Sequence, residues 1–195
     1  MKNLSARDMV LVSMFAALAA AGAIVFRWLG ATLIPFSIVP FVVVLAGCIL
    51  GPRLAALSMF LYMLIGLVGV PVFETAPFGT PAYVIRPTFG FIMGFIPAAY
   101  VTGRVVHGSN APGIARYVAG TLAGTAVLYV VGLPYLYLIL NFYMGQSFPV
   151  MTVLQIGFIP FVLWDIMKAV IAAGLARAVQ RRLFPDSYNM QESGT

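Results

Sequence analysis

Charged side chains are scarce in this chain, and their scarcity excludes most classes of soluble protein. Only 8% of the 195 residues are charged, and 62% are hydrophobic. Soluble domains carry about 25% charged residues. Because so few charged side chains leave too little polar surface to cover a water-soluble globule, the composition predicts an integral membrane protein.

Cysteine, histidine and lysine are almost absent as well. The single cysteine, Cys48, excludes an internal disulfide and a CxxC metal or redox pair. The single histidine, His107, has no metal-ligand spacing around it, and neither G-x-S-x-G nor HExxH occurs. Lys2 and Lys168 are the only lysines, and neither completes a P-loop for ATP hydrolysis. These absences predict a chain that is not an enzyme and that holds no metal and no cofactor.

The net charge of +6 does not indicate a nucleic-acid partner. A nucleic-acid surface gathers its cations in a patch with interleaved aromatic residues. Here the cations lie at the ends of apolar segments, where membrane topology and anionic lipid explain them better.

Six apolar segments are close to the length that crosses a membrane, which is about 20 residues for a hydrocarbon core of about 30 Å. The predicted spans are about residues 9–26, 34–50, 54–70, 88–106, 114–142 and 150–176. Gly132-Leu133-Pro134 interrupts the fifth, which predicts a kink there or a start at the membrane interface. An irregular, proline-rich loop, 71–87, separates the third span from the fourth. The sequence thus predicts an all-α membrane protein in which residues 1–195 form one transmembrane domain.

The lysines and arginines predict the orientation, because the cytoplasmic ends of spans carry an excess of them. With both termini inside, eight cations lie at cytoplasmic ends: Lys2, Arg7, Arg53, Arg104, Arg116, Arg177, Arg181 and Arg182. Only Arg27 and Arg86 then lie outside. The pattern predicts an N-in, C-in topology with the 71–87 loop facing the medium.

An acid and a base, Asp165 and Lys168, lie three residues apart inside the last apolar segment. A charge at membrane depth costs about 2.5 kcal/mol or more, and such charges usually line a substrate or ion path. The i, i+3 spacing puts both side chains on one helix face. The pair predicts a binding site, although two charges that only cancel each other and fix helix packing would give the same pattern.

The junction between the 71–87 loop and the fourth span is a second candidate site. Arg86 suits a carboxylate ligand, or it snorkels to lipid headgroups. Thr88 is placed to cap the helix with its hydroxyl. Gly90 and Gly94 leave a smooth face for the close approach of a helix or a ligand. The loop aromatics could shield a ligand or form an interfacial belt; they are Phe73, Phe78, Tyr83 and Phe89.

The first apolar segment carries small residues four positions apart. This spacing lets a partner helix pack backbone to backbone, either within the protein or on another subunit. The pairs are Ala16 with Ala20 and Ala17 with Ala21. Gly47 with Gly51 and Gly120 with Gly124 have the same spacing, and we expect them to pack internally.

Three blocks together resemble the BioY family, and the similarity spans nearly the whole chain. They are LGPRLAALSMFLYMLIGLVGVPVF (Leu50–Phe73), RPTFGFIMGF (Arg86–Phe95) and DIMK (Asp165–Lys168). The family contains the biotin-specific substrate-capture subunits, or S components, of energy-coupling factor (ECF) transporters. One departure is that many members read Gly-Pro-Thr-Gly-Gly-Tyr where this chain has RPTFGF.

The resemblance implies a fold, a ligand and partners. It implies a six-helix S-component fold in the bacterial plasma membrane that binds biotin from outside. The alanine-rich first helix would dock on a transmembrane coupling protein driven by two ATPase subunits. The whole subunit would then topple in the membrane to deliver its cargo.

The resemblance also gives the candidate residues roles. Asp165 would accept a hydrogen bond from a ureido N–H of biotin, because an ionised carboxylate is acceptor-only. Lys168 would donate to the ureido oxygen or to the tail, and Arg86 would bind the tail carboxylate. Tyr83, Phe89 and Trp164 would form apolar walls.

Three alternatives stay open at this point. The chain could be an S component for another vitamin, such as thiamine or riboflavin. It could be a small membrane enzyme that uses Asp165 and Lys168 as acid and base. It could also be a proton-coupled carrier in which Asp165 titrates during transport.

Overall fold

The computed structural model describes residues 4–28, 37–109 and 112–183, and these ranges contain helices and loops but no strand. The all-α prediction is therefore confirmed for the described part of the chain. The α-helices are α1 (Ala6–Trp28), α2 (Val39–Leu50), α3 (Pro52–Val68), α4 (Phe89–Val106), α5 (Ile114–Leu138), α6 (Val150–Gly157) and α7 (Ile159–Leu183). A 3-10 helix, η1 (Pro81–Ile85), and a π-helix, η2 (Ile139–Tyr143), complete the elements.

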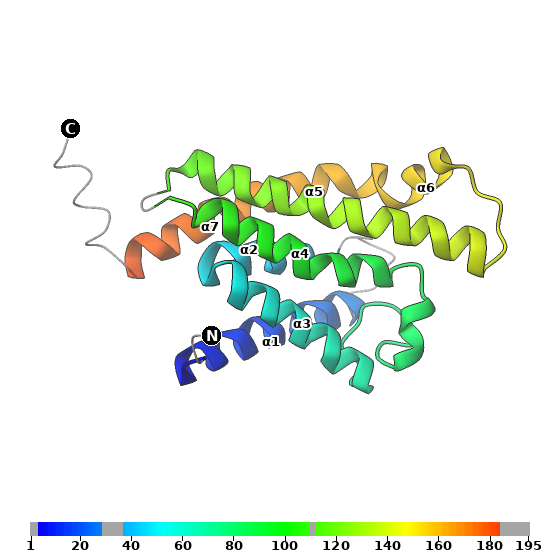
Figure 1. Ribbon diagram of the computed structural model, residues 1–195, viewed down its shortest axis with the longest axis horizontal. Coiled ribbons are helices and arrows are strands. Elements are labelled where there is room, and N and C mark those ends of the chain that lie inside the picture. Colours follow the sequence, from blue (N-terminus) through cyan, green and yellow to red (C-terminus); the bar gives the residue numbers. More distant parts are fainter. Residues whose placement is uncertain (1–3, 29–36, 110–111, 184–195) are drawn as a thin grey trace.

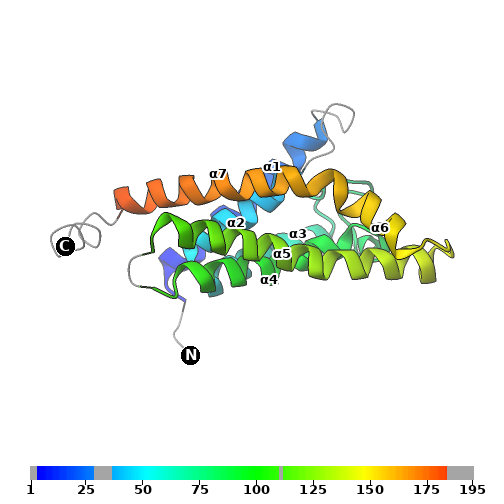
Figure 2. The same cartoon turned by 90° about the horizontal axis from the view of Figure 1, so that it is seen from above.

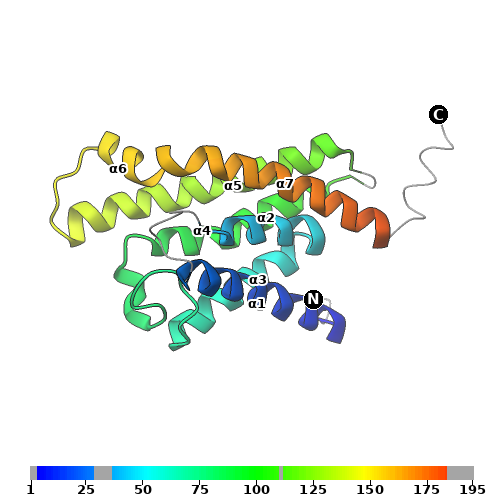
Figure 3. The ribbon, with the colours of Figure 1, turned by 180° about the vertical axis from the view of Figure 1, so that it is seen from behind.

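The helices lie side by side in an elongated bundle (Figure 1). Helices α1 and α3 form one side, α5 and α7 form the other, and α2 and α4 lie between them (Figure 3). Viewed from above, α6 and α7 follow each other along α5 (Figure 2).

Among the described residues, four stretches are long and apolar enough to cross a membrane: α1, α4, α5 with η2, and α7. Helices α2 and α3 are apolar but shorter, at 12 and 17 residues. Residues 34–36 of the predicted second span lie outside the described residues. Helix α5 continues through Pro134. The segment predicted at 150–176 is divided at Phe158 into α6 and α7, and Pro160 lies in the first turn of α7, where its missing N–H costs no helix bond.

Helix α4 is the centre of the bundle and packs against α2, α3 and α5. A side chain at Gly124 of α5 would overlap Thr102 of α4, and one at Gly47 of α2 would come within 2.6 Å of the same threonine. These glycines let the backbones approach closely, as was predicted for them. Gly51 adopts φ 80° between α2 and α3, a conformation that glycine reaches without strain.

Long-range hydrogen bonds fix the end of the bundle where α7 terminates. The Cys48 carbonyl of α2 accepts from Gln180 of α7 at 2.8 Å and lies 2.9 Å from His107 Nε2. Tyr117 of α5 donates to Gln180 at 2.7 Å. His107 is therefore exposed to solvent and also contacts the backbone of α2. Cys48 is fully buried and packs in the core as a small apolar residue.

The alanines of α1 point in two directions. Ala16 is 1% exposed and belongs to the core between α1, α2 and α3, and Ala20 is half-buried against it. Ala17 and Ala21 are exposed on the opposite face. Of the four predicted docking residues, only the second pair is therefore open to another subunit.

Candidate functional site

A cavity of about 370 Å³ opens between the 71–88 loop and the helices α2 to α7. Its walls are mainly apolar and aromatic, as in most small-molecule sites. Polar groups are gathered in a few places on this surface: Ser37, Glu74, Thr75, Thr88, Asp165 and Lys168, together with the tyrosines 62, 83 and 129.

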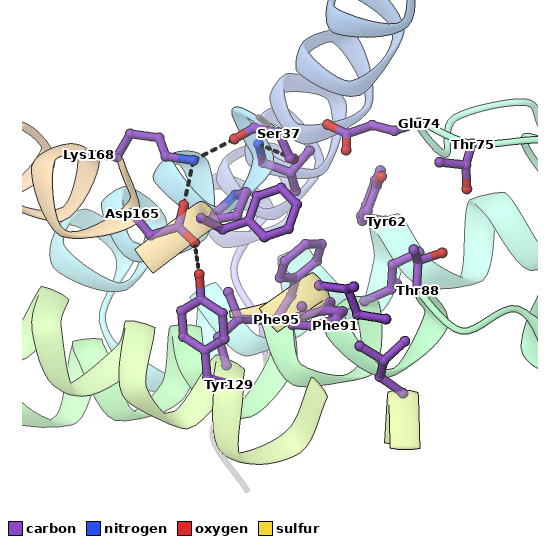
Figure 4. A pocket seen from close by; sticks show the side chains of 18 of the residues that line it. Ser37, Tyr62, Glu74, Thr75, Thr88, Phe91, Phe95, Tyr129, Asp165 and Lys168 are labelled. Carbon is purple, nitrogen blue, oxygen red and sulfur yellow. Dashed lines mark hydrogen bonds and ion pairs between the residues drawn. The ribbon is translucent and has the colours of Figure 1, made fainter. Parts of the chain in front are cut away.

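The Asp165–Lys168 pair faces this cavity (Figure 4). The two side chains form an ion pair at 2.5 Å, and Asp165 is only 7% exposed. Tyr129 of α5 donates a hydrogen bond to the other carboxylate oxygen of Asp165. Lys168 also donates to the Ser37 carbonyl at 2.8 Å. The pair is thus held by groups from two other parts of the chain, α5 and the residues before α2.

The packing of α7 explains why these charges point inward. Asp165 shares its helix face with four small residues that are each at most 1% exposed: Ala169, Ala172, Ala173 and Ala176. Small side chains let α7 pack closely on α2 and α5. The bulky residues of α7, such as Ile166 and Met167, are exposed on the other face.

A second polar group is a row of three hydroxyls beneath the loop. Thr75 and Tyr83 share a hydrogen bond of 2.5 Å, and Tyr83 and Thr88 share one of 3.2 Å. Thr88 occupies the N-cap position of α4 but makes no side-chain capping bond. The capping prediction was wrong, because the Thr88 hydroxyl forms its hydrogen bond with the Tyr83 hydroxyl instead of with the helix backbone.

The loop is held over the cavity by aromatic packing. Phe73 lies between Tyr62 and Tyr83, with ring centroids 5.8 Å and 4.4 Å away. Tyr135 of α5 donates to the Val84 carbonyl. On the α1 side, Arg27 donates to the Pro71 carbonyl at 3.1 Å. These contacts place the loop residues by tertiary structure rather than by a regular helix or strand.

Glu74 is the third polar group of the cavity, and its Oε1 atom is buried without a hydrogen-bond partner among the described residues. Burial raises the pKa of the Glu74 carboxyl above its usual range. Hydrogen bonding from Ser37 and the positive charge of Lys168 act in the opposite direction.

Four of the eight predicted ligand-binding residues line the cavity: Asp165, Lys168, Tyr83 and Thr88. Phe89 and Gly90 do not; they pack against Tyr135 of α5, so the close approach at Gly90 is made by a helix.

Arg86 is exposed and does not line the cavity. Trp164 is 44% exposed on α7 and does not line it either. The ligand role of Arg86 therefore stays a prediction that requires its side chain to move.

Several cavity residues were missed from the sequence, including Glu74, Ser37, Thr75 and Tyr129. Glu74 did carry a signal, because it is one of only five acidic residues and the single one in the outer loop. Tyr129 gave none, since a tyrosine in an apolar helix is common. Within the described residues, no group of three or more histidine, cysteine or acidic side chains could hold a metal ion.

Comparison with known proteins finds a matching family and several similar chains. The family model described as the BioY family matches residues 1–184. The probable biotin transporter BioY of Lysinibacillus sphaericus is 35% identical over 181 residues, which cover 93% of this chain and 90% of the relative. The putative biotin transporter BioYB of Bacillus subtilis is 37% identical over 186 residues, covering 93% and 92%. The biotin transporter BioY of Thermotoga maritima is 31% identical over 177 residues, covering 90% and 96%.

The fold has a solved counterpart. The S-component for biotin from an ECF-type ABC transporter superposes with a TM-score of 0.69 at 19% identity, covering 92% of this chain and 95% of that chain. The relatives named above are transport proteins rather than enzymes. With its apolar helices and its match across nearly the whole length, the chain is a multi-pass membrane protein and belongs to the BioY family.

Proposed function

We propose that this chain is the biotin-binding S component of an ECF-type uptake transporter. The observation that carries the proposal is the inward-facing Asp165–Lys168 pair, which ends an apolar cavity in a chain whose curated relatives are named biotin transporters. A buried ion pair that only fixed packing could be replaced by apolar residues at little loss. This pair instead borders open space.

Biotin has the shape that such a cavity suits. Its ureido ring is polar, its thiophane ring and valerate chain are apolar, and its tail ends in a carboxylate. We assign the ureido ring to the Asp165–Lys168 end. The tail carboxylate would lie toward the hydroxyls of Thr75, Tyr83 and Thr88, which can each donate a hydrogen bond. Arg86 would reach the same carboxylate only by moving inward.

Six membrane crossings with both termini inside remain part of the proposal. Arg104 near the end of α4, Arg116 near the start of α5 and Arg177 near the end of α7 support it, because these helix ends meet at one end of the bundle (Figure 1). Arg27 and Arg86 lie toward the other end, beside the loop. This distribution matches the excess of cations at cytoplasmic ends.

A vitamin panel tests the ligand assignment. We expect biotin to raise the melting temperature of the purified protein, because a ligand present at 100 times its Kd stabilises the native state by about 2.7 kcal/mol. Thiamine and riboflavin should leave the melting temperature unchanged. A rise with either of these vitamins and none with biotin would identify the chain as an S component for another vitamin.

We further propose that α1 docks on a transmembrane coupling protein that works with two ATPase subunits. The exposed face of α1 around Ala17 and Ala21 supports this, because small residues let a partner helix approach closely. Ala16 cannot take part directly, since it is buried inside the protein.

Replacing Ala17 or Ala21 by tryptophan should weaken the complex by about 1–3 kcal/mol, the usual cost of overpacking a close interface. The measurement is the amount of coupling protein and ATPase recovered with a tagged S component. Biotin binding by the isolated chain should not change. Val130→Trp is the matched control, because Val130 is 70% exposed on α5.

If the tryptophan variants at Ala17 and Ala21 recovered as much coupling protein and ATPase as Val130→Trp does, α1 would not be the docking face. Biotin uptake that persisted in cells lacking the ATPase subunits would instead favour the proton-coupled carrier.

A further inference from the structure

We propose that Glu74 is a specificity-determining residue of this site, and that its buried Oε1 accepts a hydrogen bond from the second ureido N–H of the ligand. The inference rests on the proposed function and deepens it. It assigns to the cavity an acceptor, a donor and a second acceptor, supplied by Asp165, Lys168 and Glu74.

The backbone around Glu74 is fixed on both sides. Tyr62 of α3 donates to the Val72 carbonyl at 3.1 Å, and the Phe73 N–H donates to the Phe78 carbonyl at 2.6 Å. The Phe73 side chain is fully buried. Glu74 is therefore held at the cavity surface although it lies in a loop.

The carboxyl of Glu74 has an unused bonding position. Oε1 is buried and has no partner among the described residues, and it belongs to a side chain that lines the cavity. Buried polar atoms in native proteins are nearly always hydrogen-bonded. A donor from the ligand would satisfy this atom.

Ser37 connects Glu74 to the charged pair. Its carbonyl accepts from Lys168 at 2.8 Å, and Ser37 lines the cavity together with Glu74. Figure 4 shows Ser37 between Lys168 and Glu74, with the Asp165 carboxylate below the lysine ammonium. The Lys168 ammonium thus pairs directly with Asp165, and its positive charge also acts on Glu74.

A cyclic urea presents the complementary pattern. It carries an N–H on either side of its carbonyl, all in one plane, so two acceptors that flank a donor match it. Asp165 would accept from one N–H, Lys168 would donate to the carbonyl and Glu74 would accept from the other N–H. A ligand N–H at Oε1 would also favour the ionised form of Glu74, against the effect of burial.

The alternative occupant of this position is the tail carboxylate. A third carboxylate beside Asp165 and Glu74 would face like charges with only Lys168 to balance them. The hydroxyls of Thr75, Tyr83 and Thr88 carry no negative charge and suit the tail better.

The test measures equilibrium binding to purified wild type, Glu74→Ala and Glu74→Gln. The ligands are biotin, biotin methyl ester, and two biotin analogues that are each methylated on a different ureido nitrogen. We expect Glu74→Ala to lower the affinity for biotin by about 10-fold, because one N–H of the ligand loses its hydrogen-bond acceptor. Glu74→Gln should lower the affinity less, since the glutamine amide oxygen can still accept a hydrogen bond from the ligand.

The analogues identify the group that Glu74 contacts. The loss of affinity that Glu74→Ala causes should be the same for biotin methyl ester, which keeps the ureido ring and lacks the tail charge. One of the two N-methyl analogues should bind wild type and Glu74→Ala equally, because its N–H facing residue 74 is already gone. The other should retain the full effect of the substitution.

Three results would overturn the inference. They are unchanged biotin affinity in Glu74→Ala and Glu74→Gln, a loss that disappears with the methyl ester, or a loss that both N-methyl analogues retain. If Glu74→Ala fails to fold, Glu74→Gln carries the same comparison. Failure of the wild type to bind biotin at all would instead remove the proposed function.

Discussion

Asp165→Asn is expected to weaken biotin binding by about 10- to 100-fold, since leaving a buried ligand N–H poorly paired costs about 1–3 kcal/mol. The asparagine keeps the shape of the side chain but removes the charge that pairs with Lys168 at 2.5 Å. Titration calorimetry on the purified protein measures the change. Unchanged affinity would disprove the assignment of Asp165 to the ligand.

A double variant separates the binding role of the pair from its structural role. Breaking a buried ion pair on one side costs about 3–5 kcal/mol of stability, whereas removing both charges together is often neutral. Asp165→Asn with Lys168→Met should therefore recover the melting temperature of the wild type but not its biotin affinity. If the double variant also recovered affinity, the pair would only be structural. Asp8→Asn is the control, because Asp8 lies at the far start of α1.

Gly66→Ala should destabilise the protein by about 1–3 kcal/mol, the usual cost of an extra methyl group in a packed core. A side chain at Gly66 of α3 would overlap the ring of Phe73. That ring packs on Tyr83 and precedes Glu74, so its displacement should also reduce biotin affinity. Thermal unfolding and equilibrium binding measure the two effects.

A second substitution tests the cause of the Gly66 effect. Phe73→Leu removes ring atoms from the position that the new methyl group needs, so it should restore part of the lost stability in the Gly66→Ala background. Gly174→Ala is the control, because a Cβ there would meet no other segment of the protein within 4 Å, and alanine favours a helix over glycine by about 1 kcal/mol. Equal changes in stability from Gly66→Ala and Gly174→Ala would show that the close Gly66–Phe73 contact is not the cause of the destabilisation.

The two substitutions act on opposite walls of one site. Asp165 is positioned by the small-residue face of α7, and Phe73 is positioned by the glycine of α3. In both cases small residues on a helix allow a functional segment to pack closely. Close packing therefore supports the polar groups of the cavity from both sides.

The membrane class, the helical fold and the placement of Asp165 and Lys168 on one helix face were evident from the sequence. These features are local: hydropathy follows from composition, and an i, i+3 pair shares a helix face wherever the helix lies. The motif blocks also gave the BioY family, which the comparison confirmed. The small residues Gly47, Gly120 and Gly124 were expected inside the protein and lie there.

The tertiary structure alone decided which other side chains reach the cavity. Arg86 and Thr88 are two positions apart, yet only Thr88 lines the cavity, because the loop turns into α4 between them. Glu74 belongs to the loop that the sequence predicts to face the medium. In the structure the packing of the neighbouring Phe73 on Tyr83 places Glu74 in the cavity wall. Tyr129 reaches Asp165 across 36 positions of sequence. Such contacts depend on how helices and loops pack against one another, and the period of a single segment carries no record of that packing.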